Sequence, residues 1–190
     1  TADYNTAVGH SALAANTTGT ENVGIGYLTF DANTTGSYST AVGTKALEAN
    51  TTGANNVGVG KDSLYANTTG AQNVAVGNTS LYDNTTGTYT TANGNTAIGY
   101  RVLEANTTGA SNVGVGNGAL LANTTADSNT AVGYDSLAAN TTGGSNTAVG
   151  FDALKTATTI SNNTGIGYYA LRLNTSGGQN VAVGQSALTA

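Results

Sequence analysis

Residues 5–21 read NTAVGHSALAANTTGTE, and residues 22–38 repeat the pattern as NVGIGYLTFDANTTGSY. One glycine of this pattern recurs along the whole chain. These turn glycines are Gly9, Gly26, Gly43, Gly60, Gly77, Gly99, Gly116, Gly133, Gly150, Gly167 and Gly184. Neighbours are 17 residues apart, except that Gly77 and Gly99 are 22 apart (99 − 77) because of a five-residue insertion at 90–94. Such a fixed period predicts a repeat architecture of eleven stacked units.

Each turn glycine follows a short segment that has the composition of a strand. The residue before the glycine is always Val or Ile, the third before it is Thr or Val, and the one between is Ala or Gly. Alternating β-branched residues indicate a short β-strand. One unit has too few apolar residues to fold alone, whereas stacked units share a core. We therefore expect an all-β protein: one β-solenoid domain over residues 1–190 with eleven 17-residue coils and a loop at 90–94.

The orientation of the strand decides which residues form the core. Four residues after each turn glycine comes Leu13, then Phe30, then Leu in every later unit. We expect this leucine column to meet inward-facing β-branched residues such as Thr6 and Val8, so that Val59→Asp would unfold or split the rod. The small residues between them would then face outward as a lateral contact between chains in a homotrimer or filament. This small-residue column is Ala7, Gly24, Ala41, Gly58, Ala75, Ala97, Gly114, Ala131, Ala148, Gly165 and Ala182.

The remainder of each unit contains a variable segment and a corner. The spacing after the glycine fits a single helical turn or a second strand. The NTTG tetrapeptide then predicts a corner, because Asn bonds to nearby backbone and Gly allows positive φ. Asn5, Asn22 and their equivalents predict a stacked amide ladder interrupted at Ser39. The ninth unit is the weakest, since Ala157 and Ile160 replace the corner Asn and Gly.

Composition excludes several classes of function. The net charge is −5, charged residues make up 8% of the chain, and Cys is absent. These values argue against nucleic-acid partners and a disulfide framework. No apolar run is long enough to cross a bilayer, so we expect no membrane insertion. Because the chain has no Met and no signal-peptide pattern, we expect a processed chain or an internal piece of a longer one.

The sequence offers little for catalysis, cofactors or metals. His10 is the only histidine and lies in a variable column without a paired base, so we expect no enzyme. The NVGVG segments lack the Lys and following helix of a phosphate loop. Two acidic pairs, Asp31 with Glu48 and Asp135 with Asp152, align in neighbouring coils. Ca²⁺ binding is one reading of these pairs and solvated surface charge is the favoured one.

Three further patterns carry binding hypotheses. The NTT segments, with NTS at Asn174, are N-glycosylation sequons, although a corner role for Asn is the simpler reading. An aromatic column could stack sugar rings or sample exposed tyrosine by chance; it comprises Tyr27, Tyr100, Tyr134, Phe151 and Tyr168. A threonine ladder at the corner could bind ice; it comprises Thr17, Thr34, Thr51, Thr68, Thr85, Thr107, Thr124 and Thr141.

The unit N-[TV]-[AG]-[VI]-G-x-x-[AS]-L-x-A-N-T-T-G resembles repeats of phage tail-fibre and related bacterial surface proteins, from Asn5 to Leu188. It is more distantly similar to the heads of trimeric autotransporter adhesins, which carry shorter S-V-A-I-G-like strands. The resemblance implies an exported or virion-borne shaft or receptor-binding head, frequently trimeric, with a glycan or cell-surface receptor as partner. We expect a non-catalytic extracellular fibre or adhesin module, with an ice-binding solenoid as the alternative.

Overall fold

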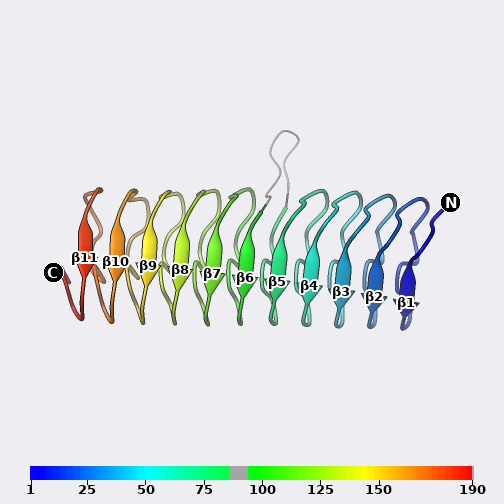
Figure 1. Ribbon diagram of the computed structural model, residues 1–190, viewed down its shortest axis with the longest axis horizontal. Coiled ribbons are helices and arrows are strands. Elements are labelled where there is room, and N and C mark those ends of the chain that lie inside the picture. Colours follow the sequence, from blue (N-terminus) through cyan, green and yellow to red (C-terminus); the bar gives the residue numbers. More distant parts are fainter. Residues whose placement is uncertain (86–93, 190) are drawn as a thin grey trace.

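The computed structural model describes residues 1–85 and 94–189, so most of the 90–94 insertion lies outside the described residues. The described chain forms one rod in which a single parallel sheet of eleven strands runs along the long axis (Figure 1). The strands are β1 (Thr6–Val8), β2 (Val23–Ile25), β3 (Thr40–Val42), β4 (Val57–Val59), β5 (Val74–Val76), β6 (Thr96–Ile98), β7 (Val113–Val115), β8 (Thr130–Val132), β9 (Thr147–Val149), β10 (Thr164–Ile166) and β11 (Val181–Val183). The prediction of a β-solenoid is confirmed.

Each strand pairs with the strand one coil along, in the same register. In β1 and β2, Ala7 lies opposite Gly24 and Val8 lies opposite Ile25. The same columns pair from β2 through to β11, including across the insertion, where Ala75 lies opposite Ala97. Equivalent positions of the repeat therefore stack on one another along the axis. We number the coils 1 to 11 by their strands, so that coils 3 and 4 span 39–72 and coils 8, 9 and 10 span 129–179.

The core lies between the small-residue column and the leucine column, which is the reverse of the predicted orientation. Ala41 and Leu47 are fully buried, whereas the flanking β-branched residues Thr40 and Val42 are partly exposed. The predicted lateral-contact face is therefore wrong. Ten of its residues are buried, namely Gly24, Ala41, Gly58, Ala75, Ala97, Gly114, Ala131, Ala148, Gly165 and Ala182. Ala7 is exposed because coil 1 has no preceding leucine to cover it.

Core width explains why these inward residues are small. A Cβ built at Gly24 would lie 3.5 Å from Cγ of Leu13, the leucine of the preceding coil. One leucine layer thus fills the space up to the strand backbone, and a branched side chain has no room there. The restriction to Ala and Gly comes from internal packing. Val59 is half-exposed, so the expectation that Val59→Asp unfolds or splits the rod fails with the same reversal.

The variable segment after the strand is built from turns, and the described residues contain neither a second strand nor a helix there. In coil 1 the N–H of Ala12 donates to Gly9 O (3.5 Å) and the N–H of Asn16 donates to Leu13 O (3.2 Å). Ser11 and Leu13 have φ of 55° and 57°, in the left-handed region. This conformation aims the N–H of Leu13 at Thr29 O of the next coil (3.0 Å), and such cross-coil bonds offset its cost.

The turn glycines end each strand where no side chain fits. Gly60 has φ of 133°, and a Cβ built there would lie 2.5 Å from Gly77 O in the next coil. Both the backbone conformation and the close approach of the following coil therefore require glycine. The same restriction repeats along the stack, which explains why this residue never varies.

Candidate interaction surface

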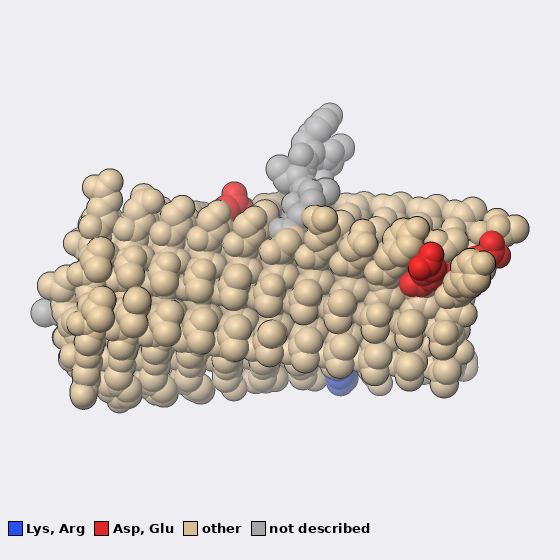
Figure 2. All heavy atoms as spheres, in the orientation of Figure 1, with Lys and Arg blue, Asp and Glu red and all other residues tan. Residues whose placement is uncertain are grey.

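The outward side of the sheet is the most regular surface of the rod. Its two columns form what we call the outer strand face. One column contains Thr6, Val23, Thr40, Val57, Val74, Thr96, Val113, Thr130, Thr147, Thr164 and Val181, and the other contains Val8, Ile25, Val42, Val59, Val76, Ile98, Val115, Val132, Val149, Ile166 and Val183. Ile98 is 42% exposed and Val132 is 36% exposed. Figure 2 shows this side, on which charged side chains appear only near the edges.

An uncharged strip of β-branched residues of this length is unusual on an isolated soluble domain. Large exposed apolar patches on monomers are rare and mark contact surfaces. A parallel sheet repeats its side chains at the strand spacing of about 4.8 Å, so the strip has the period of the rod itself. Sequence reasoning missed this surface because it placed these residues in the core. The signal was the absence of any charged or amide residue in both columns.

The threonine ladder is occupied by hydrogen bonds within the rod. The hydroxyl of Thr17 donates to Thr34 O (2.9 Å), that of Thr34 to Thr51 O (3.1 Å) and that of Thr51 to Thr68 O (3.0 Å). Thr107 and Thr124 continue the pattern in later coils. Most of these side chains are half-buried. Their hydroxyl protons are directed along the axis into the protein, so the ladder offers little hydrogen bonding outward.

The corner asparagines form a buried amide ladder of their own. The side-chain N–H of Asn33 donates to Asn16 Oδ1 (2.9 Å) and to Gly36 O (3.1 Å) within its own corner. The chain of bonds continues coil by coil to Asn140. The sequon asparagines between Asn33 and Asn140 are fully buried, so the folded rod does not present their amides for glycosylation. Asn16 and Asn174 are half-buried.

The predicted ladder before the strands is also present. The backbone N–H of Asn22 donates to Asn5 Oδ1 (2.9 Å), and the side-chain N–H of Asn73 donates to Asn56 Oδ1 (3.3 Å). Ser39 replaces asparagine in this column but keeps an acceptor, because its Oγ takes the N–H of Asn56 at 3.0 Å. The two amide ladders satisfy buried polar groups in nearly every coil, which fixes the axial register.

The aromatic column is divided by the structure into separate groups. Tyr134, Phe151 and Tyr168 stack in consecutive coils, with centroids 5.1 and 5.4 Å apart and interplanar angles of 9° and 16°. Tyr27 stacks on His10 in coils 1 and 2, and Tyr100 has no ring partner among the described residues. Because the three consecutive rings cover one another, the stack presents mainly ring edges. Sugars stack on ring faces, so this arrangement is a poor continuous glycan platform.

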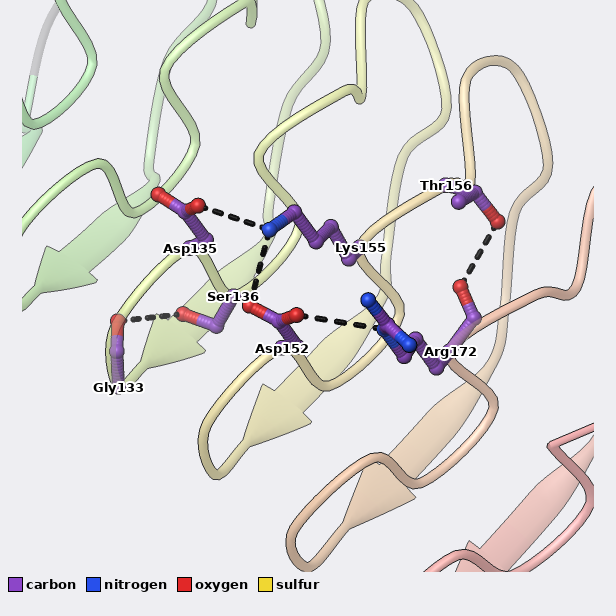
Figure 3. Close-up of polar contacts among 7 residues, drawn as sticks. All are labelled: Gly133, Asp135, Ser136, Asp152, Lys155, Thr156 and Arg172. Atoms are coloured by element: carbon purple, nitrogen blue, oxygen red, sulfur yellow. Dashed lines mark hydrogen bonds and ion pairs between the residues drawn. The ribbon is translucent and has the colours of Figure 1, made fainter.

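The two acidic pairs contact cations of the chain itself. Lys155 Nζ lies 2.9 Å from Asp135 Oδ2 and 3.1 Å from Asp152 Oδ1, as Figure 3 shows. Hydrogen bonding to Asp135 raises the pKa of Lys155. At the other pair, Lys45 Nζ lies 3.1 Å from Glu48 Oε2. In the described part of the chain no three His, Cys, Asp or Glu residues gather as metal ligands.

His10 is exposed and lies in coil 1. Its Nδ1 is 3.1 Å from Oγ of Ser11, the adjacent residue. Among the described residues no carboxylate orients this imidazole, so the pair lacks the third group of a nucleophilic triad. No helix in the described residues is long and apolar enough to span a membrane.

The most extended surface features of the described residues are thus the outer strand face, the stack of Tyr134, Phe151 and Tyr168, and the ion pairs around Lys155. Comparison of the chain with models of protein families, with curated proteins and with solved structures finds no match.

Proposed function

We propose that this chain is a non-catalytic structural module of an extracellular or virion-borne fibre, and that copies of it associate side by side through the outer strand face. The observation that carries the proposal is the exposure of the Val and Ile column along an uncharged sheet. Val76, Ile98 and Val132 are each at least 36% exposed at interior coils. Burying such side chains stabilises an assembly by about 25 cal/mol per Å² of apolar surface.

A second copy of the chain is the partner that fits this face best. The strip repeats its side chains once per coil, so a rod with the same repeat matches it at every coil along its length. A partner without this period would match at only a few positions. A closed homotrimer or an antiparallel pair would cover the strip completely, in keeping with closed symmetry in most oligomers. Recognition of a glycan or cell-surface receptor would then fall to the variable columns, whose residue types differ from coil to coil.

The experiment is sedimentation velocity of the wild type and of the double variant Val76→Asp/Val132→Asp. We expect an oligomer for the wild type and a monomer for the variant, because facing carboxylates would be desolvated and unpaired. The control variant Thr52→Asp/Thr125→Asp adds the same charge to exposed corner positions and should stay oligomeric. Circular dichroism melting of the monomeric variant should show that the fold is retained. A monomeric wild type at its highest soluble concentration would refute the assembly.

Ice binding is the second candidate, and a different surface now favours it. The outer strand face is regular and uncharged and carries threonine in six of its strands: β1, β3, β6, β8, β9 and β10. The corner ladder is less suited because its hydroxyls already donate within the rod. A thermal-hysteresis measurement on the wild type separates the candidates. Hysteresis that is lost in Val76→Asp/Val132→Asp would favour ice binding over assembly.

A further inference from the structure

Coil 9, the third coil from the C-terminal end, breaks the corner ladder. Ala157 stands where the neighbouring coils have asparagine, so Oδ1 of Asn140 in coil 8 receives no hydrogen bond although Asn140 is fully buried. The Nδ2 of Asn140 still donates to Asn123 Oδ1 at 3.0 Å. The amide ladder that begins at Asn16 therefore ends at coil 8, one coil before the irregular corner.

Coil 9 differs from the other corners at two positions. A Cβ built at Gly36, the equivalent of Ile160 in coil 2, would lie 2.5 Å from Asn33 Oδ1 and 2.8 Å from Asn50 Nδ2 of the next coil. Coil 7 nevertheless combines Ala126 at this position with the corner asparagine Asn123, whose Nδ2 donates to Ala126 O at 3.2 Å. Coil 9 has the larger Ile160 there and Ala157 in place of the asparagine.

The same change disconnects the corners of coils 9 and 10. In coil 1 the N–H groups of Thr17, Thr18 and Gly19 all donate to Thr34 O, at 3.0, 3.0 and 3.3 Å. In the described residues 157–161 and 174–179 no hydrogen bond joins the two corners. The wall of the rod that contains the corners thus has no hydrogen bond across this junction in these described residues. The strands stay paired, with Gly165 opposite Ala148.

Contacts on another wall bridge the same junction, as Figure 3 shows. Arg172 Nε of coil 10 lies 3.2 Å from Asp152 Oδ2 of coil 9, and the hydroxyl of Thr156 donates to Arg172 O at 2.7 Å. Lys155 of coil 9 reaches back to Asp135 of coil 8 at 2.9 Å. The other ion pairs of the described residues lie within one coil: Lys45 with Glu48, Lys61 with Asp62, and Arg101 with Glu104. Among the described residues, ion pairs between different coils occur only around the irregular corner of coil 9.

We propose that the junction of coils 9 and 10 is a joint at which the rod opens reversibly, and that the ion pair between Asp152 and Arg172 controls its opening. The corner wall has no bonds to break there, so the remaining connection is the strand pairing, the packed leucines and the charges. The Arg172 side chain is 37% exposed and the Asp152 side chain 3%, so added salt screens this pair less than it screens a pair of exposed charges. Ionic strength therefore modulates how often coils 10 and 11 separate from the rest of the rod. This proposal does not depend on self-association.

Native-state hydrogen exchange of amides that bond across the junction measures this opening. The N–H groups of Leu154 and Thr156 donate to Ala170 O and Arg172 O, at 3.0 and 3.1 Å. Their equivalents in coil 3 are the N–H groups of Leu47 and Ala49, which donate to coil 4 at 3.0 and 3.1 Å. We expect exchange at the junction to be at least about tenfold faster than in coil 3, and to accelerate further with added NaCl.

Two sets of variants test the cause. Arg172→Ala should accelerate exchange at Leu154 and Thr156, whereas Lys45→Ala should leave Leu47 and Ala49 unchanged. The two cations are matched in exposure, with side chains 37% and 35% exposed, but Arg172 pairs with Asp152 of the preceding coil whereas Lys45 pairs with Glu48 of its own coil.

A variant that restores asparagine and glycine to the corner of coil 9 distinguishes a joint from simple fraying near the C-terminal end of the rod. Ala157→Asn/Ile160→Gly should slow exchange at Leu154 and Thr156 to the rate of coil 3. Ala157→Asn alone should slow it only in part, because Ile160 keeps a branched side chain where the other described corners have Gly or Ala. Equal exchange at both junctions in the wild type, or fast exchange that persists in the double variant, would overturn the proposal.

Discussion

Leu47 of coil 3 packs against the backbone of Gly58 in coil 4, such that a Cβ at Gly58 would lie 3.3 Å from Leu47 Cδ1. Leu154 and Gly165 repeat this relationship between coils 9 and 10. Each leucine thus fills the core under the next strand, and the coils interlock along the axis. A coil cannot be packed without its neighbour, which accounts for the dependence of the fold on stacking.

Gly58→Leu should destabilise the rod by about 3 kcal/mol or more, because the added carbons must enter space that Leu47 already occupies. Urea denaturation followed by circular dichroism measures the loss. Val57→Leu, one residue earlier on the outer strand face, should change stability by less than about 0.5 kcal/mol. Equal losses for the two variants would mean that the strand is oriented the other way.

Asn50→Ala should destabilise the fold by about 3 kcal/mol, since it removes a buried side chain from the middle of the corner ladder. The Nδ2 of Asn50 donates to Asn33 Oδ1 (2.8 Å) and to Gly53 O (3.0 Å), and its Oδ1 accepts from Asn67 (2.8 Å). Each buried donor or acceptor that is left without a hydrogen bond lowers the stability by about 1–3 kcal/mol. The exposed Asn117 provides the control, and Asn117→Ala should melt like the wild type. If the corner ladder did not stabilise the fold, Asn50→Ala and Asn117→Ala would both melt at the temperature of the wild type.

Gly60→Ala should be among the most damaging single-methyl additions, with a loss of about 3 kcal/mol or more. The new Cβ would meet Gly77 O at 2.5 Å with φ at 133°, which L-residues rarely adopt. Gly118→Ala is the comparison, because φ there is 68° and the neighbouring atom is the flexible carboxylate of Asp135. That variant should lose only about 1 kcal/mol. Thermal melts of both proteins, side by side, decide whether backbone approach or φ alone restricts these positions.

The stability contributed by Lys155 should disappear at high pH. Its hydrogen bond to Asp135 raises the pKa of Lys155 above the ordinary 10.5, so the folded state holds this proton more tightly than the unfolded state. The contribution is therefore complete below about pH 10 and is lost as pH rises through the raised pKa. The melting temperature of the wild type should exceed that of Lys155→Met at neutral pH and converge with it above about pH 11. A difference that is constant across this range would assign the effect to packing of the lysine stem.

The turn glycines and the asparagine columns were predictable from the sequence, whereas the turns of residues 10–15 were not. The turn glycines gave the period, the strands and their register, because a residue that recurs every 17 positions must stack on itself. The asparagine columns similarly predicted amide ladders, since stacked amides supply one another with donors and acceptors. Residues 10–15 form turns, and neither the expected helical turn nor the expected second strand is present there. Its turns depend on left-handed residues such as Leu13, which adopt that conformation only because the next coil provides an acceptor.

The sequence by itself determined that this chain stacks eleven equivalent coils, since repeated strands, glycines and asparagines leave one way to pair them. Only the tertiary structure decided which side of each strand faces inward. In a three-residue strand such as Thr40–Val42, the alternation of side chains is satisfied by either orientation. The choice depends on the width of the core, where one leucine layer leaves room for Ala41 and none for Val42. The same width places the Val and Ile column on the surface, where the proposed contacts between rods form.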